Sequence, residues 1–329
     1  MDAFPVFLTE PWLGKPLWLW LLFLGVVLAL LVLDLGLLNR KDKTIGVRRS
    51  LALSSGYVAV ACLFGIWVWW WMGSAAALDW YTAYFVEKSL SLDNVFVISV
   101  IFTYLAVPRE LQHRVLFWGI LGVIVMRGLM IALGVALLDR FEWVLYLFAV
   151  FLLFSGVRML TAGDSEPDIG KNPVLRFLRR HFRVTQSIEG PHFLVRQEDP
   201  KTGRDVWHAT PLLIALVLVE SADLVFAVDS IPAVFAITRD PYIVYTSNIF
   251  AVLGLRALYF ALAAMVHRFH YLKYALGAVL LFIGGKIFYA ELWAKPDPAV
   301  SLLVTAGLLG GGVLISLLRT RERPETERA

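Results

Sequence analysis

Apolar segments of about twenty residues follow one another along the whole chain and are separated by short polar stretches. We distinguish nine of them, at residues 16–38, 50–72, 82–106, 114–138, 142–162, 210–237, 243–265, 272–293 and 299–318. A helix of twenty residues is about 30 Å long, which matches the hydrocarbon core of a bilayer. The pattern therefore predicts an all-α membrane protein with about nine transmembrane helices. The composition agrees, with 59% hydrophobic residues, 17% charged residues and a mean hydropathy of +0.71.

Lysine and arginine residues divide unevenly between alternate connecting segments. The segments on the side of the first connection hold 22 of them, whereas the opposite side holds only Lys15, Arg140, Arg239 and Lys295. Positively charged segments stay in the cytoplasm, so we expect the N-terminus outside the cell membrane and the C-terminus in the cytoplasm. An odd number of helices satisfies this orientation. The first apolar segment is long and lacks a preceding basic region, which predicts a retained anchor and not a cleaved signal.

An internal repeat divides the apolar segments into two sets of three. Residues 152–159 match 280–287, Arg127 matches Arg256, and Asp93 matches Asp229. Leucine-rich helices can resemble one another by chance, but the matching basic residues favour true duplication. Because each unit has an odd number of helices, the repeats are expected to be inverted, as in many secondary transporters. The predicted organisation is a two-helix extension, a first repeat, a cytoplasmic loop, a second repeat and a last helix with a basic tail, at residues 1–73, 74–162, 163–209, 210–293 and 294–329.

The cytoplasmic loop carries two predicted elements. Residues 172–182 alternate basic and apolar positions as in an amphipathic helix, with Leu175, Leu178 and Phe182 on one face. Residues 192–196 and 205–208 are typical of a short hairpin. The loop either docks a protein partner or connects the repeats along the lipid surface, and the second interpretation is favoured.

Five carboxylates lie at membrane depth in two related segments: Glu87, Asp93, Glu220, Asp223 and Asp229. A carboxylate at this depth costs several kcal/mol unless it is paired, hydrated or bound to a cation. With Lys88, Arg127 and Arg256, the repeats hold five acids and three bases. The surplus of two negative charges equals the charge of one divalent cation. The alternative is that the acids and bases only pair with one another and lock the repeats together.

Helical spacing sorts these residues into faces. Glu87, Ser91 and Asn94 share one face of a helix, and Glu220 and Asp223 share another, whereas Asp229 lies opposite Glu220. Because Pro232 cannot donate a backbone hydrogen bond, we expect that helix to kink or unwind at residues 228–231. Lys88 is expected to extend toward the outer interface.

The available ligand atoms are hard oxygens, which suit Mn²⁺, Mg²⁺ or Ca²⁺. All six histidines lie in loops or at helix ends, so a zinc or copper site is not expected. The candidate metal ligands are Glu87, Asp93, Asn94, Glu220, Asp223, Asp229 and Ser230, with Ser91 and Asn248 as further candidates. Arg127 and Arg256 are candidates for charge compensation or gating.

Residues 220–241 and 246–259 closely resemble the TerC family, including its Alx-type proteins, and residues 90–96 and 171–176 fit as well. The resemblance covers about residues 30–319. It implies metal-ion homeostasis, chiefly manganese efflux, and places the five carboxylates on the family's acidic positions. The family name comes from tellurium resistance, although an acid-lined site is unsuited to anionic tellurite. Some members are linked to supplying metal to secreted enzymes, and a chloroplast relative to membrane-protein assembly.

The sequence therefore predicts a transporter that exports Mn²⁺ by alternating access, with protons as a plausible coupling ion. The alternative function is a membrane scaffold or assembly factor associated with metal or tellurite stress, acting through the 163–209 loop. We expect no enzymatic activity and no prosthetic group, because the sequence has no CxxC motif, no nucleotide-binding motif and no paired histidines within its apolar segments. The expected partners are the metal cation and the lipid bilayer, and no nucleic acid.

Overall fold

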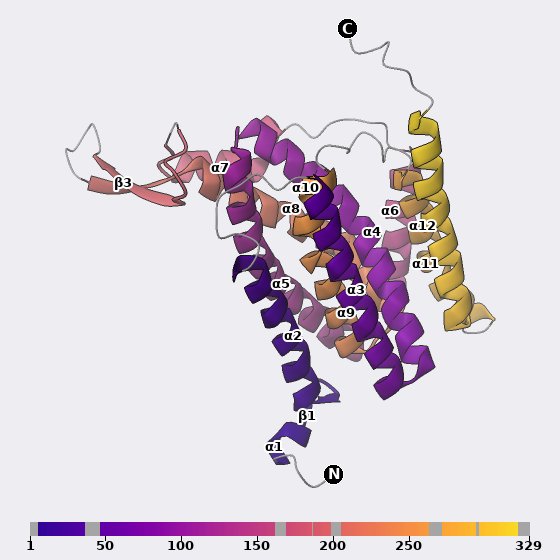
Figure 1. The fold of residues 1–329 in the computed structure, drawn as a ribbon. Helices are drawn as coiled ribbons and strands as arrows, with labels where there is room; N and C mark the ends of the chain where they lie inside the picture. The colour runs from indigo at the N-terminus through magenta and orange to yellow at the C-terminus, as the bar shows by residue number, and fades with distance from the viewer. Residues whose placement is uncertain are drawn as a thin grey trace.

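The computed structural model describes residues 6–36, 47–161, 169–185, 187–198, 205–262, 272–293 and 296–321. Long helices dominate this part of the chain and pack side by side in one bundle (Figure 1). Before them come the short helix α1 (Val6–Thr9) and a small hairpin of β1 (Pro11–Trp12) and β2 (Lys15–Pro16). The predicted all-α architecture is confirmed.

The helices of the bundle correspond in position to the apolar segments of the sequence. They are α2 (Leu17–Gly36), α3 (Val47–Met72), α4 (Ser74–Tyr104), α5 (Arg109–Arg140), α6 (Val144–Thr161), α8 (Pro211–Phe235), α9 (Pro241–Leu253), α10 (Leu255–Leu262), α11 (Leu272–Leu292) and α12 (Pro298–Arg321). Seven spans are long and apolar enough to cross a membrane within the described residues, with α9 and α10 together forming one of them. Helix α2 has a shorter apolar stretch, and the 31-residue α4 is not among the seven, so the count of nine stays a prediction.

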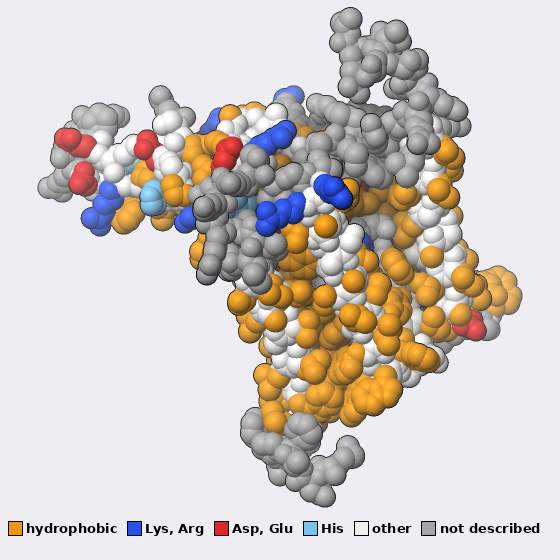
Figure 2. All heavy atoms as spheres, viewed as in Figure 1, with side chains coloured by type: hydrophobic (Ala, Val, Ile, Leu, Met, Phe, Trp, Pro, Cys, Tyr) orange, Lys and Arg blue, Asp and Glu red, His pale blue; other side chains and the backbone are white. Residues whose placement is uncertain are grey.

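The outer surface of the bundle is apolar. Leu28, Val32, Leu129 and Leu303 are each at least 60% exposed, which is expected of side chains that face lipid. Figure 2 shows hydrophobic side chains over the flank of the bundle, while Lys and Arg gather at the end that carries the 169–209 segment. The start of α2 and the end of α12 lie at opposite ends of the bundle (Figure 1).

Helix α9 forms the centre of the bundle. All of its residues from Tyr242 to Leu253 are buried except Tyr245, which is partly buried, and the helix packs against α3, α4 and α5. It begins at an Asp-Pro pair, where the Asp240 side chain accepts hydrogen bonds from the backbone of Tyr242 and Ile243. It ends at Gly254, after which α10 continues. The break therefore lies inside protein, where a membrane helix tolerates one.

Residues 228–231 do not unwind, so that part of the expectation is wrong, while the kink stays a prediction. Helix α8 is continuous from Pro211 to Phe235 and contains Pro232. Proline removes one backbone donor, and this single loss is not enough to end the helix here. Pro232 and the residues on either side of it are buried against neighbouring helices, which hold the backbone in place.

The segment between α6 and α8 has the two predicted elements. Helix α7 (Pro173–His181) starts at Asn172, whose side chain accepts hydrogen bonds from the next turn. Leu175 and Leu178 are buried as expected, but Phe182 is 53% exposed and does not share their buried face. Strands β3 (Leu194–Glu198) and β4 (Asp205–Ala209) pair as the predicted antiparallel hairpin, which projects sideways from the bundle (Figure 1).

Glycines allow α6 and α11 to pack with their backbones nearly in contact. A Cβ atom on Gly156 would lie 2.9 Å from the carbonyl oxygen of Gly277, and one on Gly277 would lie 3.0 Å from the oxygen of Gly156. Gly284 meets the carbonyl oxygen of Ala149 at 3.0 Å in the same way. By contrast, a Cβ atom on Gly285 would meet nothing within 4 Å.

We predict that Gly156→Ala destabilises the protein by about 1–3 kcal/mol, because the new Cβ atom collides with backbone that cannot move independently. The matched change Gly285→Ala is expected to be neutral or to stabilise slightly, since alanine favours helix and the site is open. Thermal unfolding of the purified proteins in detergent checks both. Equal midpoints for the two variants would contradict the packing described here.

Candidate functional site

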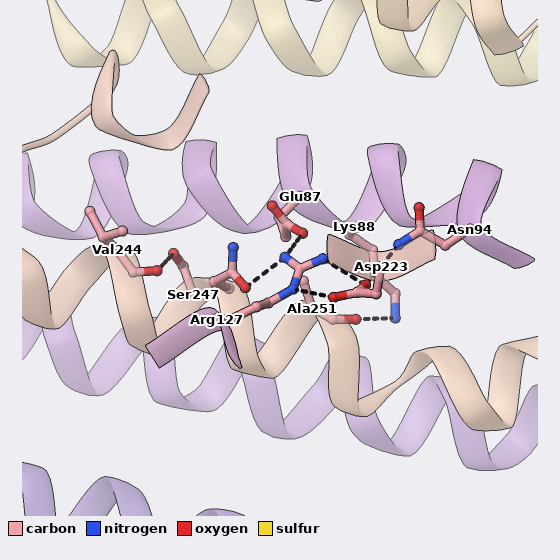
Figure 3. A network of polar contacts seen from close by, with 9 residues as sticks. Glu87, Lys88, Asn94, Arg127, Asp223, Val244, Ser247 and Ala251 are labelled. Atoms are coloured by element: carbon pink, nitrogen blue, oxygen red, sulfur yellow. Dashed lines mark hydrogen bonds and ion pairs between the residues drawn. The ribbon is translucent and has the colours of Figure 1, made fainter. Parts of the chain in front are cut away.

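A buried arginine lies at the centre of the bundle. Arg127 comes from α5 and is 1% exposed. Its Nε and Nη2 atoms donate to the two carboxylate oxygens of Asp223 on α8, at 3.1 and 2.9 Å. Its Nη1 atom donates to Glu87 on α4 and, at 2.7 Å, to the side-chain oxygen of Asn248 on α9. One guanidinium group therefore joins four helices (Figure 3).

The sequence spacing explains how the helices present these groups. Glu87 and Asn94 are seven residues apart and lie on the same face of α4, as predicted. Asn94 donates to Asp223 at 3.1 Å, so this carboxylate also receives a bond from α4. The network thus joins α4 and α5 of the first predicted repeat to α8 and α9 of the second.

The electrostatics of the network depend on mutual compensation. Glu87 and Arg127 are each 1% exposed, and Asp223 is 7% exposed. Removing charged groups from water is costly, and the attraction between them offsets that cost only when the geometry is good. The two-pronged contact with Asp223 is the geometry that a guanidinium favours. Arg127 forms ion pairs with two of the five carboxylates, and its role in charge compensation or gating stays a prediction.

Several buried side-chain oxygen atoms of α4 and α8 have no hydrogen-bond partner among the described residues. On α4 they are the second carboxylate oxygen of Glu87, the hydroxyl of Ser91 and the side-chain oxygen of Asn94. On α8 they are the Ser230 hydroxyl and both carboxylate oxygens of Glu220. Buried polar atoms are almost always paired, because an unpaired one is costly in a low-dielectric interior. Each of these oxygens is available to accept a hydrogen bond or to bind a cation.

Glu220 lies against α5, apart from the contacts of Arg127. Its Oε1 atom would be 3.6 Å from a Cβ atom on Gly119, and a Cβ atom on Gly122 would collide with the carboxylate. These two glycines lie three residues apart on α5 and leave space for the side chain. Sequence reasoning found Glu220 but missed the glycines, because only the packing of α5 on α8 shows what they accommodate.

The five carboxylates do not form one cluster. Asp229 is not among the hydrogen-bond partners of Arg127 and accepts a hydrogen bond from Ser155 of α6 at 2.9 Å. Asp93 is six residues from Glu87 and lies on another face of α4. In the described part of the chain, no group of three or more His, Cys, Asp or Glu side chains could hold a metal ion. The role of these carboxylates as metal ligands stays a prediction, and the side chain of Arg256 lies outside the described residues.

Lys88 does not extend to the outer interface, so that expectation is wrong. Its Nζ atom donates to the backbone oxygen of Ala251 at 3.1 Å, inside the bundle (Figure 3). The reason is the start of α4, which begins at Ser74 and not near residue 82. Lys88 therefore lies in the middle of a 31-residue helix, too far from either end for its side chain to reach the interface.

Comparisons with known proteins agree with the architecture. The family model of the integral membrane protein TerC family matches residues 72–324. An uncharacterized membrane protein of Myxococcus xanthus is 45% identical over 97% of this chain and 98% of its own length. A protein of Escherichia coli named "Putative membrane-bound redox modulator Alx" is 46% identical over 90% of this chain and 92% of its own length. No solved structure matches the chain significantly.

We predict that Arg127→Met lowers the free energy of unfolding by about 3–5 kcal/mol, because it leaves the carboxylates of Glu87 and Asp223 buried without compensation. The triple variant Arg127→Met/Glu87→Gln/Asp223→Asn is expected to recover most of the loss, since it removes the unpaired charges. Thermal unfolding in detergent ranks the three proteins. An Arg127→Met protein as stable as the native protein would show that the ion pairs contribute little to stability.

Proposed function

Because the chain belongs to the TerC family of integral membrane proteins, we propose that it transports a divalent metal cation. The proposed cargo is Mn²⁺, exported from the cytoplasm by alternating access, with the N-terminus outside the cell membrane. The unpaired buried oxygens beside the Arg127 network are the observation that carries this proposal.

The chemistry of these oxygens supports a hard cation. The face of α4 offers a carboxylate, a hydroxyl and an amide oxygen from Glu87, Ser91 and Asn94, all of them buried. Mn²⁺ and Mg²⁺ favour such ligands and retain part of their water shell, so they do not need a complete protein cage. A single carboxylate with neutral oxygens around it is compatible with a cargo that must also leave.

The packing of α6 on α11 supports the inverted repeat. The sequence match pairs Gly156 with Gly284, and the same spacing pairs Ala149 with Gly277. Gly156 of α6 contacts Gly277 of α11, and the matching residues Gly284 of α11 and Ala149 of α6 contact each other. The second contact is therefore the first one with α6 and α11 exchanged. A two-fold axis between the repeats produces this exchange. Matching Asp93 to Asp229 likewise pairs Glu87 with Asp223, and both of these bind Arg127.

The count of nine crossings has its own support. Helix α4 is long enough to span a bilayer, and its polar residues Glu87, Asn94 and Lys88 have partners inside the bundle. The start of α2 and the end of α12 lie at opposite ends of the bundle (Figure 1), as an odd number of crossings requires. The seven apolar spans together with α2 and α4 would give the proposed nine crossings in the described part of the chain.

The proposed cycle uses Arg127 as a counter-charge. When no cargo is bound, the guanidinium forms ion pairs with both Glu87 and Asp223. An entering cation competes with it for these carboxylates, and release restores the ion pairs. A carboxylate that exchanges metal for a proton, such as Glu220, would couple export to proton entry.

We predict that Ser91→Ala lowers Mn²⁺ flux several-fold, because it removes one ligand oxygen, and that Glu87→Gln nearly abolishes it. The change Ser89→Ala on the same helix is the matched control and should leave flux unchanged, since Ser89 lies on a different face from Glu87 and Ser91. Flux is measured with purified protein in liposomes that contain a Mn²⁺-sensitive dye.

The same assay distinguishes the scaffold alternative. A transporter loses flux in Glu220→Gln/Asp223→Asn but retains it when the β3–β4 hairpin is shortened. The transport proposal is wrong if native protein transports no Mn²⁺ into the liposomes and if deletion of the hairpin alone removes the resistance of cells to metal or tellurite stress.

A further inference from the structure

The C-terminal end of helix α9 lies deep inside the protein. The last turn of a helix carries partial negative charge, because its carbonyl groups lack partners within the helix. Helix α9 stops at Leu253, and the residues on both sides of the break, Val252 and Leu255, are buried. In transporters, such interrupted helix ends are places where monovalent cations bind.

The Lys88 ammonium group occupies this end of α9. Its Nζ atom donates to the carbonyl oxygen of Ala251, in the last turn, at 3.1 Å. Gly254 at the break leaves room for it, since a Cβ atom there would lie 2.5 Å from Nζ and 3.8 Å from the preceding carbon. Any other residue at this position would push the ammonium away from the helix end.

Charge balance indicates why a cation is needed here. Glu87 and Asp223 supply two negative charges to the network in Figure 3, and Arg127 and Lys88 supply two positive charges. Arg127 alone leaves one negative charge, in addition to the partial charge of the α9 terminus. Among Glu87, Asp223 and Arg127 the deficit is one unit of charge, which a monovalent cation such as the Lys88 ammonium fills.

We propose that the end of α9 is a monovalent-cation site whose occupant is the Lys88 ammonium, a covalently attached substitute for free Na⁺ or K⁺. The native protein is therefore complete without either ion. A variant that opens the site and removes the charge acquires a binding site for one of them. The inference rests on the contacts of Lys88 and does not depend on Mn²⁺ being the cargo.

The test measures thermal unfolding of full-length protein in detergent, in choline chloride, NaCl or KCl at equal ionic strength. Lys88→Ala is expected to unfold at a lower temperature than native protein in choline, and to gain about 2 °C or more on saturable addition of Na⁺ or K⁺. The unfolding temperature of native protein should change by less than about 1 °C between the salts, because the Lys88 ammonium excludes the ion.

Two further variants serve as controls. Lys88→Met fills the space without a charge and should be destabilised in all three salts without a specific response, since its side chain blocks the site. Lys15→Ala removes an ion pair to Asp240 elsewhere and should respond as the native protein does. If Lys88→Ala does not survive purification, Lys88→Ser opens the same space with a smaller loss of polarity.

Binding of radioactive ²²Na⁺ or ⁸⁶Rb⁺ to the same samples gives the second readout. One saturable site in Lys88→Ala, absent from native protein and from Lys88→Met, is the expected result. A Lys88→Ala protein with no ion-specific stabilisation and no binding would overturn the proposal and leave Lys88 as a packing residue. Neither readout involves metal transport, so failure here and failure of Mn²⁺ flux are separate results.

Discussion

The buried guanidinium of Arg127 is the interaction on which the centre of this molecule depends. It bonds to carboxylates on α4 and α8 and to an amide on α9, and itself belongs to α5. The charges are too deep for water to solvate, so none of these groups is stable at its position without the others. The four helices are therefore held in one arrangement by a network that includes two of the five predicted carboxylates.

This constraint connects stability with the proposed transport. A cation that binds Glu87 or Asp223 must compete with Arg127. The same two carboxylates would therefore bind the cargo and hold the helices together. The unpaired oxygens of Ser91 and Asn94 lie on the same helical face as Glu87, next to the ion pairs. In the proposed cycle, the candidate ligand atoms therefore lie beside a counter-charge that can replace the cargo, which suits a site that must fill and empty.

Sequence reasoning predicted the helices, the connecting hairpin and most of the central residues, because apolar length and helical spacing are local properties. It correctly placed Glu87, Ser91 and Asn94 on one face. It failed where tertiary packing decides the outcome. Neighbouring helices keep α8 continuous through Pro232, and α4 extends eight residues further toward its N-terminus than predicted, which moves Lys88 from the interface into the core. The break at Gly254 was likewise missed, since its surroundings come from distant segments.

Anomalous scattering from a crystal grown with Mn²⁺ tests the central claim most directly, because it locates the metal without reference to activity. The account predicts a single strong peak within the bundle, within about 2–2.5 Å of oxygens from Glu87, Ser91 or Asn94, with Arg127 displaced from at least one of its carboxylates. A peak confined to the 169–209 segment or the bundle ends, with the Arg127 network intact at saturating Mn²⁺, would contradict it.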